Sequence, residues 1–110
     1  EISYSYNINT KNKYFLQRIK PYPLPQGVFS DEYEIVSFIK KDLQKFSTAM
    51  NSSNFNLFLD IARKVNNITS MAEHLFLNYN VNGNQLLRIN TELDDILKEI
   101  EFTKNTSKEI

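Results

Sequence analysis

Few residues in this chain have the types and the spacing that catalysis requires. His74 is the only histidine, and there is no cysteine. On a helical wheel His74 lies almost opposite the apolar stripe of its segment. No carboxylate stands three residues before it, where a carboxylate-bridged two-metal site would place one. No segment brings a nucleophile, a base and an orienting group together. We therefore expect no enzyme activity and no cofactor.

The segment from Asn78 to Gly83 imitates the first half of a calcium-binding loop. Asn78, Asn80 and Asn82 alternate before the glycine, as the early ligands of an EF-hand loop do. Calcium, however, needs anionic oxygens and a bidentate glutamate at the twelfth position, which here is Ile89. An asparagine-rich turn is the better interpretation, and we expect no bound metal. The acids that follow are typical of a solvated helix face: Glu92, Asp94, Asp95, Glu99 and Glu101.

The N-terminal segment interleaves aromatic rings with cations, a combination found on surfaces that bind single-stranded nucleic acid. Four bases are few beside the roughly six to ten phosphate contacts of a strong binder. Alternating aromatic residues also pack well against helices, and this is the favoured interpretation. The alternative is a nucleic-acid-binding accessory protein, and its arm would consist of Tyr4, Tyr6, Lys11, Lys13, Tyr14, Phe15, Arg18 and Lys20.

Length and composition are those of an ordinary small domain. The 110 residues contain 13 bases and 13 acids, so no net charge attracts nucleic acid or an anionic membrane. No apolar run approaches the roughly 18–20 residues that span a membrane, and no signal-peptide pattern is present. The chain begins at Glu1 rather than at methionine. We expect a cytoplasmic protein without a membrane span, with a processed or secreted form as the alternative.

Three apolar stripes at helical spacing fill most of the chain after Tyr33. The first stripe is Ile35, Val36, Ile39, Leu43, Phe46 and Met50. The second is Phe58, Ile61, Ala62, Val65, Ile68, Ala72, Leu75, Phe76 and Tyr79, and the third is Leu86, Ile89, Leu93, Ile96, Leu97 and Ile100. Three such stripes must bury one another. The pattern therefore predicts an all-α protein, an antiparallel up-down-up bundle of three helices.

An N-terminal arm precedes the predicted bundle and is expected to pack on it. Residues 2–8 alternate as a half-buried strand does, and residues 14–19 form a hairpin with them, a short helix or an extended strip. Pro21, Pro23 and Pro25 predict a polyproline-like connector that ends at Gly27. The domain organisation expected is an arm with this connector at 1–28, the bundle at 29–102 and a frayed polar tail at 103–110.

Several apolar residues lie off the three stripes and are the candidates for contact with a partner. They are Tyr33, Phe38, Met71, Leu77, Leu87 and Phe102. The favoured hypothesis is a non-catalytic protein–protein interaction module or small subunit of an assembly. It would bind a partner helix or a second copy in an apolar groove. A further alternative rests on size, helicity and a bias toward Lys, Asn and Ile, which are similar to those of the immunity proteins of Gram-positive bacteriocins.

Overall fold

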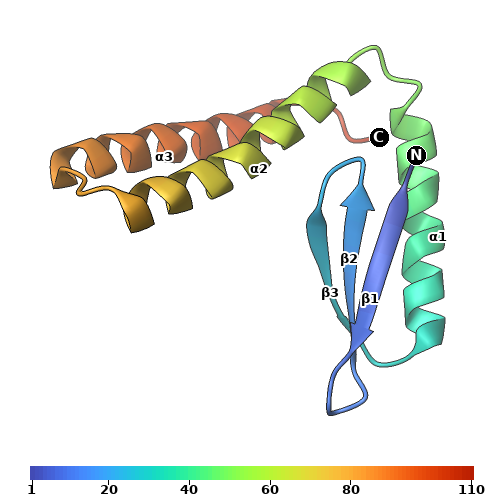
Figure 1. The fold of residues 1–110 in the computed structure, drawn as a ribbon. Coiled ribbons are helices and arrows are strands. Elements are labelled where there is room, and N and C mark those ends of the chain that lie inside the picture. Colours follow the sequence, from blue (N-terminus) through green and yellow to red (C-terminus); the bar gives the residue numbers. More distant parts are fainter. The chain divides into compact units, whose positions relative to one another are not determined.

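The computed structural model describes residues 1–110, and in it a three-stranded sheet precedes three helices (Figure 1). The strands are β1 (Ser3–Ile8), β2 (Tyr14–Lys20) and β3 (Leu24–Phe29), antiparallel and in the order β1-β2-β3. The all-α prediction is therefore wrong. The chain is a mixed protein that is 60% helical and 17% strand.

The error arises at the proline-rich segment, where a connector was predicted and a strand is found. β3 pairs only with β2, so it is an edge strand. An edge strand tolerates proline because one of its sides needs no backbone donors, and the fixed φ of proline suits an extended chain. A third strand turns a marginal hairpin into a sheet that can support a helix on one face.

Local turn chemistry sets the register of the sheet. The side chain of Asn9 accepts hydrogen bonds from the backbone nitrogens of Lys11 and Lys13, which closes the turn between β1 and β2. A bulge interrupts the pairing of β2 with β3, because Leu16 lies opposite Gly27 whereas Gln17 lies opposite Pro25. Gly27 has a φ of +117°, a conformation that favours glycine. The bulge changes the direction in which the side chains on this part of the sheet point.

The helices are α1 (Glu32–Ala49), α2 (Phe55–Asn78) and α3 (Gly83–Thr106). They occupy the stretches that carry the three stripes. The N-cap of α1 is Asp31, whose side chain accepts from the backbone nitrogen of Glu34, and that of α3 is Asn82. α2 continues without a break through Asn66 and Asn67. Its apolar periodicity therefore outweighs two poor helix formers.

The chain divides into two compact units. Unit 1 is Glu1–Ser70, which contains the sheet, α1 and the first part of α2. Unit 2 is Met71–Ile110, which contains the last residues of α2 and all of α3. Within unit 1, α1 contacts β2 and β3 and lies along the sheet (Figure 1), whereas the prediction had placed it in a helical bundle.

The buried core is small and belongs to unit 1. Leu16, Ile35 and Phe46 are the only buried apolar residues, and Arg18 and Asp42 are buried beside them. No residue of α2 or α3 is buried. The apolar spacing on α1 thus serves the sheet, while the other two helices keep their stripes partly exposed.

Glycine at position 27 is required by its backbone conformation rather than by crowding. A Cβ atom there would meet nothing within 4 Å, but φ is +117°. We expect Gly27→Ala to lower the free energy of unfolding of unit 1 by about 1–3 kcal/mol. Urea unfolding followed by tyrosine fluorescence measures this, since five of the six tyrosines lie in unit 1.

Gly83→Ala is the matched control. Gly83 is also unobstructed but has no positive φ, and it begins α3. Alanine there should leave stability unchanged or raise it slightly, because alanine is the better helix former. Equal losses at both positions would contradict a conformational requirement at Gly27.

Candidate functional site

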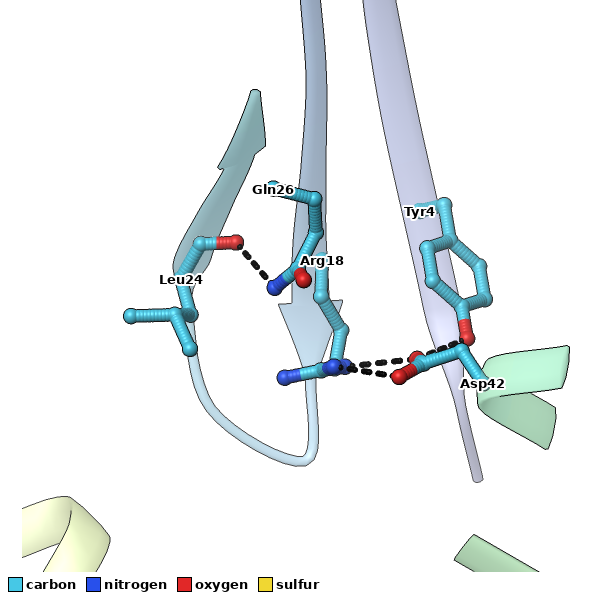
Figure 2. A network of polar contacts seen from close by, with 5 residues as sticks. All are labelled: Tyr4, Arg18, Leu24, Gln26 and Asp42. Carbon is cyan, nitrogen blue, oxygen red and sulfur yellow. Dashed lines mark hydrogen bonds and ion pairs between the residues drawn. The ribbon is translucent and has the colours of Figure 1, made fainter. Parts of the chain in front are cut away.

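The most organised cluster of polar side chains joins β1, β2 and α1. Arg18 donates from Nε to Oδ2 of Asp42 at 3.0 Å and from one terminal nitrogen to Oδ1 at 2.7 Å. The Tyr4 hydroxyl donates to the same Oδ2 at 2.5 Å. Figure 2 shows the guanidinium and the carboxylate side by side, with the tyrosine ring reaching Asp42 from the neighbouring strand. The carboxylate therefore accepts three hydrogen bonds.

Aromatic rings complete the surroundings of Arg18. The guanidinium carbon lies 4.7 Å from the centre of the Phe46 ring and 5.6 Å from that of Tyr22. Arg18 is 5% exposed and Asp42 9% exposed. A buried ion pair is stable only when geometry and hydrogen bonding offset the loss of hydration. The two-point contact, the tyrosine hydroxyl and the ring faces supply both here.

The pKa values of the cluster follow from burial and from these partners. Burial alone would raise the pKa of Asp42, but the hydrogen bonds and charge of Arg18, with the hydrogen bond of Tyr4, hold it below its usual value. Burial and the carboxylate of Asp42 raise the pKa of Tyr4 to about 12. Burial also raises the pKa of Tyr22, an effect that the charge of Arg18 partly offsets. Because the Asp42 carboxylate already accepts three hydrogen bonds and has a lowered pKa, it is a poor base.

The sequence contains signals for this cluster, but they lie on two separate segments. Asp42 lies seven residues after Ile35 and four before Phe46, which is the spacing of the buried face of α1. Arg18 occupies the same face of β2 as the buried Leu16. A carboxylate and a guanidinium at core-facing positions predict a buried pair only once the sheet and α1 are known to pack together.

The four cations of the predicted nucleic-acid arm do not lie together as free charges. Arg18 is buried against Asp42, and Lys20 Nζ lies 3.2 Å from a carboxylate oxygen of Glu1. Lys11 and Lys13 lie in the exposed turn between β1 and β2, and neither pairs with a carboxylate. Two of the four bases are therefore available to a phosphate backbone.

The aromatic residues of that arm lie on two faces of the sheet. Tyr4, Tyr6 and Tyr14 share the face that α1 covers, since Tyr4 bonds Asp42 and Tyr6 packs against Tyr14 with ring centres 5.8 Å apart. Burial and the nearby Glu32 carboxylate raise the pKa of Tyr14. Phe15 points to the opposite face by strand alternation and is 38% exposed. The arm does not form one strip of alternating rings and cations.

The six apolar residues that lie off the stripes differ in exposure. Phe38 packs against Phe29 with ring centres 5.4 Å apart and is half-buried. The other five are more than 60% exposed: Tyr33, Met71, Leu77, Leu87 and Phe102.

The stripes themselves provide the exposed apolar surface that sequence reasoning missed. On α3, Ile96, Leu97 and Ile100 are 48%, 64% and 56% exposed. On the part of α2 that lies in unit 1, the exposed stripe residues are Phe58, Ile61, Val65 and Ile68. Periodicity identified an apolar face on each helix correctly. It could not say whether the chain itself covers that face.

The one histidine of the chain has only local partners. His74 is exposed, lies 3.2 Å from the side-chain amide of Asn78, and packs edge-on against Tyr79. No group of three or more His, Cys, Asp or Glu side chains could hold a metal ion.

Unit 1 has a hollow of about 400 Å³ beside Phe46, Met50 and Leu59. None of the helices is long and apolar enough to cross a membrane.

No protein family, curated protein or solved structure matches the chain. The functional reading therefore depends on the geometry alone. The similarity to bacteriocin immunity proteins was drawn from size, helicity and composition, and of these grounds the sheet contradicts the all-helical fold.

Breaking the buried pair from one side should destabilise unit 1 strongly. We expect Asp42→Ala to lower the free energy of unfolding by about 3–5 kcal/mol, because Arg18 would stay buried without a partner. Replacing both partners, with Arg18→Met and Asp42→Leu, should restore much of the loss. Urea unfolding followed by tyrosine fluorescence measures both changes.

The exposed pair of Lys64 and Asp60, 2.9 Å apart on α2, is the control. Asp60→Ala should cost less than about 1 kcal/mol. Similar losses for Asp60→Ala and Asp42→Ala would contradict a special role for burial.

The stability of unit 1 should fall at both ends of the pH scale. Asp42 has a lowered pKa, so its contribution is present above the unfolded value of about 3.9 and is lost as the pH falls below it. Tyr4 has a raised pKa, so its contribution is complete below pH 10.0 and is lost as the pH rises toward about 12. Urea midpoints across this range test both limbs. Tyr4→Phe should make the alkaline limb shallower and leave the fall in acid. Part of the alkaline fall should remain, because the pKa values of Tyr14 and Tyr22 are also raised. An alkaline limb as steep as that of the wild type would contradict the assignment to Tyr4.

Proposed function

We propose that this chain is a non-catalytic protein–protein interaction module, or a small subunit of an assembly, that binds through the apolar faces of its last two helices. The observation that carries the proposal is the exposure of Ile96, Leu97 and Ile100 on one face of α3. Each half-exposed Ile or Leu forgoes roughly 1 kcal/mol of burial. Contiguous exposed apolar residues of this kind mark sites where another molecule binds.

The exposure of α3 supports this proposal. No residue of α3 is buried, and Leu86 and Leu93 are the only residues of its stripe that are half-buried. A partner helix laid along this face would bury the stripe, as in helix-in-groove recognition.

The absence of catalysis is part of the same proposal. The most ordered polar cluster, formed by Tyr4, Arg18 and Asp42, satisfies its own hydrogen bonds inside unit 1. Such a cluster holds a fold together and offers no free base or nucleophile to a substrate. Nucleic-acid binding has less support, because only Lys11 and Lys13 among the cations of the arm lack a carboxylate partner.

Two pairs of substitutions on α3 test this proposal. Ile96→Asp with Ile100→Asp should reduce partner retention on the immobilised full chain, and any self-association, by at least about tenfold, because the new carboxylates would have to be desolvated. Circular dichroism should show unchanged helicity, since both residues are about half exposed already.

Leu87→Asp with Phe102→Asp is the matched control. It adds the same charge to the same helix, more than about 100° around the axis from the stripe. It should leave binding intact. Loss in the control pair alone would move the binding site to the residues off the stripes. A wild-type chain that binds neither a partner protein nor itself would overturn the proposed function.

A further inference from the structure

We propose that the hollow beside Phe46 in unit 1 is a binding site for a small amphipathic acid, a molecule with an apolar chain and a carboxylate. This inference goes beyond the proposed function and does not depend on it, because every residue that lines the hollow lies in unit 1. It follows from the size of the hollow, from the chemistry of its walls and from one arginine that has no acidic partner.

The hollow has the size and the walls of a small-molecule site. Its volume of about 400 Å³ falls within the range of roughly 300–1,000 Å³ that is usual for ligand pockets. Most of the side chains that line it are apolar, and they come from the sheet end, from the end of α1 and from the start of α2: Ile2, Pro21, Phe46, Met50, Phe55 and Leu59. Walls of this composition favour an apolar chain, because its burial there removes apolar surface from water.

Four aromatic rings hold these walls together. Tyr22 contacts both helices, since its ring centre lies 6.5 Å from that of Phe46 on α1 and 5.7 Å from that of Phe58 on α2. The ring of Phe58 lies 6.2 Å from that of Phe55, which lines the hollow. Aromatic pairs at such distances are stabilising. The hollow is therefore bounded by packed rings of both helices.

The charges at the hollow favour an anion. Two cations, Lys20 and Arg63, and one acid, Glu1, complete the lining. Glu1 pairs with Lys20 at 3.2 Å, whereas Arg63 takes part in none of the ion pairs of the chain. The lining therefore has a net positive charge. The guanidinium of Arg63 has donors free for a carboxylate, which it can bind at two points.

A second hollow adjoins the first at this arginine. Its volume is about 550 Å³, and Arg63 and Pro21 line both hollows. On its α2 side it is lined by amides and hydroxyls, namely those of Asn66, Asn67, Thr69 and Ser70. Arg63 thus lies where apolar walls are followed by polar ones. An amphipathic acid matches this order, with its chain against Phe46 and Leu59 and its carboxylate at Arg63.

The methyl groups of the two methionines report on binding. Met50 lines the hollow and Met71 lies in unit 2, so a carbon-13 methionine spectrum of the full chain has one signal at the site and one away from it. Titration with octanoate should shift the Met50 signal to a plateau, with one molecule bound per chain, and leave the Met71 signal in place. The absence of a saturable shift, or an equal shift of both signals, would overturn the proposal.

Arg63→Gln tests the recognition of the acid group, with octanol as the neutral probe of the same chain length. The substitution should lower the affinity for octanoate relative to that for octanol by about fivefold, the effect of an ion pair at a surface. Lys64→Gln is the matched control, because it removes a cation from the next position of α2, and Lys64 pairs with Asp60 and does not line the hollow. It should leave the ratio unchanged. Equal effects of the two substitutions would contradict a carboxylate site at Arg63.

Leu59→Glu tests the apolar walls. The new carboxylate should weaken the binding of octanoate by at least about tenfold, because it would have to be desolvated beside the chain of the ligand. Circular dichroism should show unchanged helicity, since glutamate is a good helix former. Wild-type affinity in this variant would contradict binding in the hollow. Ile96→Asp with Ile100→Asp, which tests the proposed function, should leave octanoate binding unchanged, so the two proposals can fail separately.

Discussion

The contact of Arg18 with Asp42 is the interaction on which the rest of unit 1 depends. It joins the central strand of the sheet to α1, and the hydroxyl of Tyr4 adds the first strand to the same carboxylate. A two-point guanidinium–carboxylate contact has a narrow range of distances and angles. The pair therefore specifies where α1 lies along β2, which three apolar side chains alone would specify weakly.

The same pair explains how much of the fold the sequence could predict. The helices follow from local periodicity. The stripe of α2 keeps its phase through Asn66 and Asn67, and this correctly predicts that the helix continues there. The third strand could not be found this way. Pro21, Pro23 and Pro25 are typical of a connector, and only pairing with β2 makes Leu24–Phe29 an edge strand. Long-range pairing has no signature in a local window.

The candidate site was predictable to a similar degree. The stripes of α2 and α3 were recognised as apolar faces, but their exposure depends on what else the chain can place against them. The bundle prediction assigned α1 to that role. Instead, α1 packs on the sheet, and Ile35 and Phe46 are buried there beside Asp42. Because the position of α1 was predicted wrongly, the stripes of α2 and α3 were expected to form a core and are instead partly exposed. Arg18 was expected to be a free cation of the arm and is instead buried.

The apolar content of the chain is not matched by the number of apolar residues that it buries. Its hydrophobic content of 41% is ordinary for a domain that buries its own core. Yet only Leu16, Ile35 and Phe46 are buried among the apolar residues. A polar cluster at the centre of unit 1 holds the sheet and α1 together with little apolar burial. Of the α2 stripe, Phe58 packs edge-on against Tyr22, with ring centres 5.7 Å apart. Exposed stripes of this length are unfavourable in water and promote non-specific aggregation, which is the physical reason for proposing an interface on these two helices.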